Sequence, residues 1–142
     1  MPQKRLGQRS FCSRKDTTSK SGYRGGDLFL KDELSRHAEL VVATEDGSAG
    51  TRGNVLDAIK ENDLHADAIF ACGPGPMLRA LKAYAEEQGI DCYLSLEERM
   101  ACGIGACLAC VCKSKDVDAH TNVKNKRICK DGPVFAADEI EL

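Results

Sequence analysis

Apolar residues along the chain form short runs whose spacing alternates between the period of a strand and that of a helix. Residues 39–43 (ELVVA) and 67–72 (DAIFAC) are compact apolar runs next to polar or glycine-rich turns, which predicts two strands. In residues 90–96 (IDCYLSL), apolar positions alternate with other residues, which predicts a third strand with one buried face.

Helical spacing fills the intervals between these runs. Residues 27–37 carry leucines four positions apart, and apolar residues in 54–60 also share one helical face. The longest helix is predicted between Pro76, which a first turn tolerates, and Gly89, which ends the helix. The order strand–helix–strand–helix–strand predicts an α/β fold with a partial parallel sheet, whose ligands bind at the carboxyl ends of the strands.

Composition divides the chain into three parts. Residues 1–20 hold six Lys and Arg against one Asp, without periodicity, and we expect a disordered basic tail. Residues 21–98 contain the α/β pattern, and residues 99–142 are rich in cysteine and glycine. This last part is too short to build a good apolar core alone, so a bound metal centre would supply cohesion.

The overall balance of residues excludes several classes of protein. Hydrophobic residues make up 42% and charged residues 30%, as in a globular protein. No apolar run approaches the roughly 20 residues that span a bilayer, and the amino terminus lacks the apolar segment of a secretory signal. We therefore expect a cytoplasmic protein with no membrane partner and, given a basic segment with one aromatic residue, no nucleic-acid partner.

Five of the eight cysteines fall within residues 102–129. Without an export signal, this clustering favours a metal site over disulfides. Cys102-x4-Cys107-x2-Cys110, followed by a distant Cys129, matches the plant-type pattern for a [2Fe–2S] cluster. Glycines inside the first loop would let backbone N–H groups approach the sulfur atoms.

A zinc site is the main alternative, because four thiolates also suit tetrahedral Zn²⁺. Zinc ribbons usually contain two C-x2-C pairs, whereas only Cys107 and Cys110 form one here. Cys112 lies two residues beyond a proposed ligand, and we expect it to be a buried thiol outside the cluster. A zinc protein would be colourless, and an iron–sulfur protein brown.

Two glycine-containing loops follow predicted strands. Residues 72–76 (CGPGP) end one strand and open a helix, so their backbone N–H groups could face a ligand. Residues 44–50 (TEDGSAG) end another strand. Each loop, taken alone, is equally typical of an ordinary turn.

The segments TEDGSAGTRG, ACGPGPMLRAL, CGIGACLACVC and RICKDGPVF occur in this order along the chain. With them, residues 21–142 resemble the carboxyl-terminal part of the electron-transfer subunit of dihydroorotate dehydrogenase type B, in the ferredoxin–NADP reductase superfamily. The resemblance implies that residues 21–98 are part of an NAD-binding α/β domain and that residues 99–142 form the [2Fe–2S] module.

The resemblance also implies a function in pyrimidine (UMP) biosynthesis. Electrons would pass through the cluster between a flavin and NAD(H) reductase site and the FMN of a dihydroorotate dehydrogenase catalytic subunit, in a hetero-oligomer. The chain would be an oxidoreductase subunit with no catalytic acid or base of its own. Asp46, Gly47 and Ser48 would lie near the nucleotide, Cys72 and Gly73 beside the nicotinamide. The cluster ligands would be Cys102, Cys107, Cys110 and Cys129.

The flavin side of the family is not visible in this sequence. The Arg-x-Tyr-Ser type motif of the FAD-binding barrel does not occur, and neither do the first strand and glycine-rich turn of the nucleotide domain. We therefore expect a fragment that binds FAD and NAD(H) poorly by itself. The flavin subunit of an anaerobic sulfite reductase or hydrogenase is the alternative relative; the CKDGPVF segment favours the dihydroorotate system.

Overall fold

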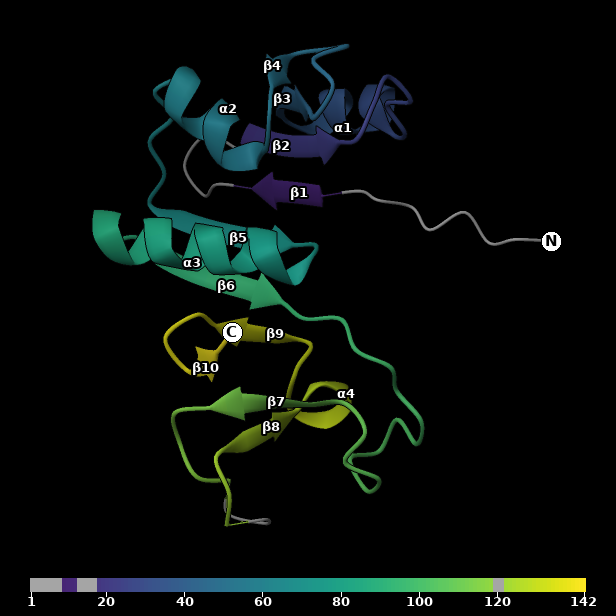
Figure 1. The fold of residues 1–142 in the computed structure, drawn as a ribbon, viewed down its shortest axis with the longest axis vertical. Coiled ribbons are helices and arrows are strands. Elements are labelled where there is room, and N and C mark those ends of the chain that lie inside the picture. Colours follow the sequence, from purple (N-terminus) through teal and green to yellow (C-terminus); the bar gives the residue numbers. More distant parts are fainter. Residues whose placement is uncertain (1–8, 13–17, 119–121) are drawn as a thin grey trace, which may run out of the picture. The chain divides into compact units, whose positions relative to one another are not determined.

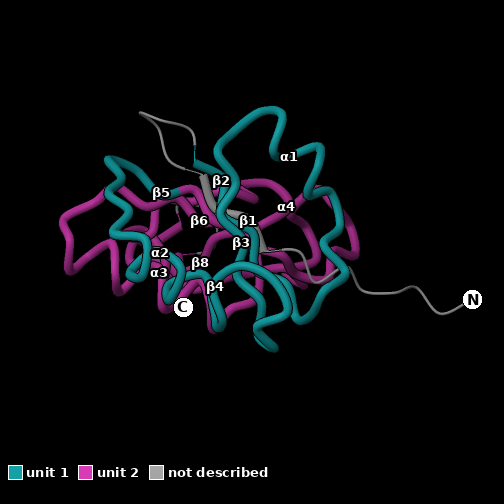
Figure 2. Tube along the Cα trace, turned by 90° about the horizontal axis from the view of Figure 1, so that it is seen from above, with its two compact units in different colours: residues 1–69 teal, residues 70–142 magenta. Residues whose placement is uncertain are grey.

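The computed structural model describes residues 9–12, 18–118 and 122–142. The chain forms two compact units, residues 1–69 and 70–142, with the division inside one strand (Figure 2). The composition changes elsewhere, near residues 97–99, so the domain limits drawn from the sequence stay a prediction. Within the described residues, each helix is too short or too polar to cross a lipid bilayer.

The first unit is a small sheet with two helices (Figure 1). Its strand order is β4-β3-β2-β1; β2, β3 and β4 run parallel, and β1 is antiparallel to β2. Helix α2 packs against β3 and β2. The elements are β1 (Arg9–Cys12), β2 (Thr18–Tyr23), α1 (Lys31–His37), β3 (Glu39–Thr44), β4 (Thr51–Arg52) and α2 (Val55–Glu61).

Strand β1 and residues 18–20 of β2 lie in the segment for which the sequence predicted a disordered tail. Residues 1–8 and 13–17 of that segment lie outside the described part. The sequence TSKSGY of β2 has no apolar alternation, yet all six of its residues are buried. Its backbone pairs with β3 over the whole strand, from Thr18 opposite Glu39 to Tyr23 opposite Thr44. This pairing partner lies more than 15 residues away, so the local pattern did not predict the strand.

The predicted helix of residues 54–60 is confirmed as α2. Asn54 caps its first turn: the side-chain oxygen accepts hydrogen bonds from the N–H groups of Leu56 (2.8 Å) and Asp57 (3.2 Å). The Asp57 carboxylate accepts the Asn54 N–H in return, at 2.8 Å. This reciprocal box satisfies N–H groups that a helix start leaves unpaired.

The second unit contains the long helix and the cysteine-rich segment. Strands β5 and β6 run in the same direction, and α3, which lies between them in sequence, contacts β6 (Figure 1). Helix α3 buries Leu78 and Leu81 and ends at Gly89, whose φ of 68° is left-handed. The predicted strand–helix–strand unit is confirmed, and so is the α/β class. These elements are β5 (Ala68–Cys72), α3 (Gly75–Gln88) and β6 (Asp91–Ser95).

The cysteine-rich segment adds one strand next to β6 and also forms a small sheet of its own. Strand β9 pairs antiparallel with β6, with Leu94 opposite Phe135. The separate sheet has the order β10-β7-β8, with Val111 opposite Arg127. These short strands were not predicted. The elements are β7 (Val111–Ser114), β8 (Asn125–Arg127), α4 (Ile128–Asp131), β9 (Val134–Ala136) and β10 (Ile140–Glu141).

Candidate metal centre

The loop that carries three of the predicted ligands lies between β6 and β7. Strand β6 ends at Ser95 and β7 begins at Val111, so strands fix both ends of the loop. Gly103 and Gly105 have φ angles of 69° and 80°, which a residue with a side chain adopts at a cost. These two residues allow the chain to bend tightly around the Cys102 side chain.

Cys102 is the centre of the hydrogen bonds in this loop. Its sulfur accepts the backbone N–H groups of Ala106 at 3.3 Å and Cys107 at 3.4 Å. Hydrogen bonds from the backbone of Cys107 and Ile104, and from the Cys107 side chain, lower the pKa of the Cys102 thiol to about 6. Such donors stabilise a sulfur that carries negative charge, as a metal-bound thiolate does.

Cys110 and Cys129 form a second pair, although 18 residues separate them. The Cys129 N–H donates to the Cys110 sulfur at 3.4 Å, and the neighbouring Ile128 N–H donates to the Cys110 carbonyl at 2.9 Å. Cys110 is buried, with 2% exposure. The Cys110 side chain and burial raise the pKa of the Cys129 thiol, and the charges of Cys110 and Cys102 add to this. Charge on one of these sulfurs therefore affects the other.

Hydrogen bonds link the four cysteines as two pairs, Cys102 with Cys107 and Cys110 with Cys129. A tetrahedral zinc site needs four donors around one ion, whereas a [2Fe–2S] cluster needs two thiolates on each of two irons. Backbone donors aimed at sulfur suit metal-bound thiolates in either kind of site, and the assignment of Cys102 and Cys107 to one iron and of Cys110 and Cys129 to the other remains a prediction.

Gly105 is the point at which the loop meets helix α4. An ideal Cβ at this buried glycine would lie 2.9 Å from Cδ of Lys130 and 3.3 Å from Cδ of Arg127. A hydrogen bond from the Gly105 backbone also lowers the pKa of the Cys129 thiol. The absence of a side chain therefore lets the loop approach the helix that carries Cys129.

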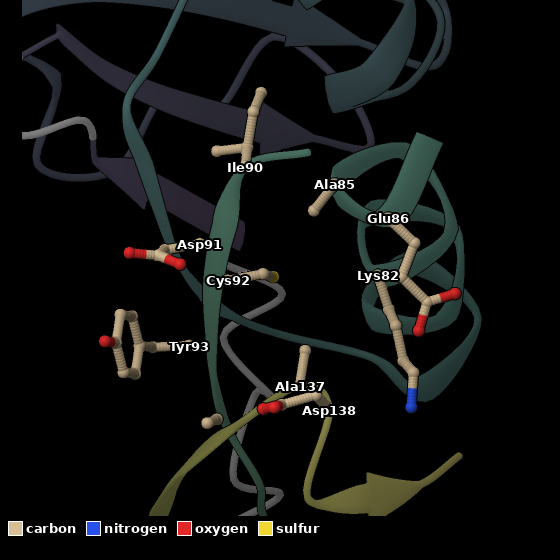
Figure 3. Close-up of a pocket in the computed structure, with 10 residues that line it drawn as sticks. Lys82, Ala85, Glu86, Ile90, Asp91, Cys92, Tyr93, Ala137 and Asp138 are labelled. Atoms are coloured by element: carbon tan, nitrogen blue, oxygen red, sulfur yellow. The ribbon is translucent and has the colours of Figure 1, made fainter. Parts of the chain in front are cut away.

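Two further cysteines of this unit, Cys112 and Cys92, have different surroundings. Cys112 lies on β7 opposite Lys126, is half-buried, and has a thiol pKa raised mainly by burial. Cys92 points from β6 toward α3 into a hollow of about 350 Å³, with Tyr93 on the opposite side of the strand (Figure 3). Burial raises the pKa of the Cys92 thiol to about 11. A protonated, buried thiol behaves as a small apolar side chain.

The loop after β3 contains the predicted nucleotide-site residues of the first unit. The Asp46 carboxylate accepts the Ser48 hydroxyl at 2.7 Å and the Ser48 N–H at 2.9 Å. These bonds lower the pKa of Asp46. Gly47, with φ 76°, forms the bend between them. The three residues thus form one hydrogen-bonded turn, and their contact with a nucleotide remains a prediction.

The predicted nicotinamide-site residues lie at the end of β5 in the second unit. The Cys72 sulfur lies 3.7 Å from a carboxylate oxygen of Glu97, which the sequence analysis did not single out. Burial and the negative charge of Glu97 raise the pKa of the Cys72 thiol. Gly73 follows with a φ of 155°. The role of Cys72 and Gly73 at a nicotinamide also remains a prediction.

The sequence analysis also missed Arg127 and Asp131, which flank Cys129 on either side. They form an ion pair within one helical turn, with the Arg127 Nε 3.0 Å from Asp131 Oδ2. The signal was present in the segment RICKD, because opposite charges four residues apart meet on a helix.

Comparison with known proteins identifies the segment around these cysteines. Residues 97–141 match the model of a family described as the iron–sulfur cluster binding domain of dihydroorotate dehydrogenase B. The match confirms the iron–sulfur module that the cysteine spacing predicted and the family resemblance of the sequence motifs.

Longer relatives match most of the chain. Dihydroorotate dehydrogenase B (NAD(+)) electron transfer subunits of Fusobacterium nucleatum and Listeria monocytogenes are 49% and 50% identical over 120 and 116 residues. Each match covers 82% of this chain and 43% of the relative, so the chain spans less than half the length of these relatives.

A solved structure shares the fold. It belongs to an NADH-dependent reduced ferredoxin–NADP oxidoreductase studied for flavin-based electron bifurcation, and its sequence is 30% identical. The TM-score is 0.73, and the match covers 89% of this chain and 44% of that chain. The predicted ferredoxin-reductase-like fold is confirmed.

The low pKa of Cys102 predicts a pH profile for its alkylation in the metal-free chain. Because the thiolate is the reactive form, the rate with iodoacetamide should rise through about pH 6 and level off near pH 7. Cys92, with a thiol pKa of about 11, should stay unmodified at that pH. Mass spectrometry of peptides measures both rates. A Cys102 rate that rises only above pH 8 would contradict the hydrogen-bonded loop.

Gly105→Ala should disturb the loop more than Gly103→Ala. Both residues have positive φ, but an ideal Cβ at Gly103 has no atom within 4 Å, whereas one at Gly105 is crowded by α4. The extra cost from crowding should be about 1 to 3 kcal/mol in urea unfolding. Iron content after anaerobic reconstitution should fall in the same order. Equal losses in the two variants would show that the loop does not depend on its contact with α4.

Proposed function

Because residues 97–141 match the iron–sulfur cluster binding domain of dihydroorotate dehydrogenase B, we propose that this chain is an electron-transfer module with a [2Fe–2S] cluster. Cys102 and Cys107 bind one iron, and Cys110 and Cys129 bind the other. When bound, such a cluster takes up and releases one electron at a time. The chain places the cluster and sets its potential, with no acid or base of its own.

The paired sulfurs are the observation that carries this proposal. The donors to them are backbone N–H groups, from Ala106 and Cys107 to one sulfur and from Cys129 to another. Hydrogen bonds to cluster sulfurs raise the reduction potential, because they stabilise the additional negative charge of the reduced state. Cys107 is exposed, whereas Cys110 is buried, so the first pair lies nearer to the surface.

The partner is the FMN-containing catalytic subunit of dihydroorotate dehydrogenase, in a cytoplasmic hetero-oligomer of pyrimidine biosynthesis. The names of the relatives, electron transfer subunits of dihydroorotate dehydrogenase B (NAD(+)), support this assignment. Electrons exchange between that FMN and a reductase site for FAD and NAD(H) elsewhere in the complex. Residues 21–98 contribute the nucleotide side of that site, and residues 99–142 contribute the cluster.

On the nucleotide side, the turn of Asp46, Gly47 and Ser48 lies near the bound nucleotide, and Cys72 and Gly73 lie beside the nicotinamide. The turn follows the carboxyl end of β3, and Cys72 and Gly73 lie at the carboxyl end of β5. These positions support the assignment, because ligands of α/β sheets bind at the carboxyl ends of strands. The likeness to a ferredoxin–NADP oxidoreductase structure supports it as well.

The ligand assignment predicts which cysteine variant loses the metal. After anaerobic purification, the chain should contain about two irons and two sulfides. Cys129→Ser should lose most of both, while Cys112→Ser, a matched change on the adjacent strand β7, should keep them. Metal analysis and visible absorption measure this. Stoichiometric zinc in a colourless preparation would overturn the proposal, and the reverse result for the two variants would reassign the fourth ligand.

The electron-transfer role predicts reduction of a flavin partner. Two equivalents of the loaded, chemically reduced chain, mixed anaerobically with the FMN-containing catalytic subunit of a relative, should bleach the visible absorption of that FMN, because each cluster supplies one electron and full reduction of FMN takes two. The Cys129→Ser chain, treated identically, provides the control for residual reductant. If both chains bleach the flavin at the same rate, the cluster is not the donor and the proposed role fails.

A further inference from the structure

We propose that Arg127 and Asp131 form a positioning pair that fixes Cys129 and the loop of residues 102–107 relative to each other, so that retention of the cluster depends on it. This inference rests on the proposed function. It assigns a role to two residues that bind neither metal nor substrate.

Three hydrogen bonds join the two residues. Asp131 Oδ2 accepts the backbone N–H of Arg127 at 2.8 Å and its Nε–H at 3.0 Å. Asp131 Oδ1 accepts from Nη2 at 3.3 Å. The Arg127 guanidinium also lies 3.7 Å from Asp118. Arg127 is 8% exposed, whereas the Asp131 side chain is 28% exposed, so water reaches the carboxylate but little of the guanidinium.

The pair closes the single turn that carries Cys129. Helix α4 spans Ile128–Asp131, only four residues, and a helix of this length has little stability of its own. The Asp131 carboxylate bonds the backbone of Arg127, the residue before the first turn, and so holds the two ends of α4 together. The N–H groups of Ile128 and Cys129 then point at the carbonyl and the sulfur of Cys110.

The Arg127 stem also contacts the loop of the other three cysteines. Its Cδ would lie 3.3 Å from a Cβ at Gly105, so the methylene groups pack directly against the bend next to Cys102. The guanidinium cannot move away without breaking its bonds to Asp131. One side chain therefore touches the turn of the fourth cysteine and the loop of the first three.

A second ion pair in the same segment lacks these connections. Lys126 Nζ lies 2.7 Å from Glu139, and Lys126 is the residue directly before Arg127 on β8. This pair contacts Cys112, which is not a predicted ligand: a hydrogen bond with the Lys126 backbone lowers the pKa of the Cys112 thiol, and the Lys126 ammonium lies 5.8 Å from the centre of the Phe135 ring. Variants of Lys126 and Glu139 therefore control for loss of an ion pair in this part of the fold.

The test compares the rate of iron loss from the full chain after anaerobic reconstitution. An iron chelator is added, and the decay of the visible absorption is followed for Arg127→Met, Arg127→Lys and Asp131→Ala. Arg127→Met and Asp131→Ala should lose iron about tenfold faster than wild type or more. The rates of iron loss from Lys126→Met and Glu139→Ala should stay within about twofold of the wild-type rate.

A spectroscopic measurement separates positioning from general stability. The g-values of the reduced cluster in electron paramagnetic resonance should shift in Arg127→Met, since they report ligand geometry. Arg127→Lys keeps the charge but loses the planar fork, so its rate of iron loss should lie between those of wild type and Arg127→Met. If Arg127→Met does not fold, Arg127→Lys and Asp131→Asn carry the comparison.

The outcomes distinguish this inference from the proposed function. A wild-type chain that takes up no iron overturns both. A wild-type chain that holds about two irons, with Arg127 and Asp131 variants that lose iron no faster than Glu139→Ala, overturns the positioning role and leaves the cluster assignment intact.

Discussion

The constraint that governs this structure is the electrostatic repulsion between cysteine sulfurs gathered in one place. Thiolates that approach each other need positive partners, and before a metal binds, backbone N–H groups and the nearby Arg127 guanidinium supply them. The N–H groups of Ala106 and Cys107 point at Cys102, and that of Cys129 points at Cys110. The bend at Gly103 and Gly105 follows from the same requirement, because N–H groups converge on a sulfur only where the chain turns tightly.

The sheets of the second unit fix the positions between which this loop can bend. Strand β6 enters the loop while paired with β9, and β7 leaves it while paired with β8. The pairing of Val111 with Arg127 also brings the end of β8, and thus the start of α4, next to Cys110. A register shift by one residue would separate Cys110 from Cys129. The short strands therefore matter for the metal centre more than their length suggests.

The sequence predicted those elements whose cause is local. Strands β3, β5 and β6 and helices α2 and α3 have their own apolar pattern or cap, as with Asn54 and Gly89, and the structure confirms them. Strands β2, β8 and β10 are short or polar, and they form because distant segments pair with them. A short stretch of sequence does not show such pairing. The cysteine spacing predicted the module that the family match confirms. The contact of Arg127 with Gly105 could not be predicted, because it joins two segments that are distant in the sequence.

The two pairs of sulfurs differ in how firmly the protein alone holds them. Cys110 is buried and bonded through the backbone of α4. Among the described residues of 99–142, the large buried apolar side chains are Ile128, Phe135 and Ile140. Cys107 is exposed, and Ile104 in the same loop is 73% exposed, so little apolar contact holds that part of the loop. With so small a core, a cluster bound by both pairs would contribute much of the cohesion of this segment. In a bound cluster, the exposed outer pair would also give an electron its shortest path to another protein.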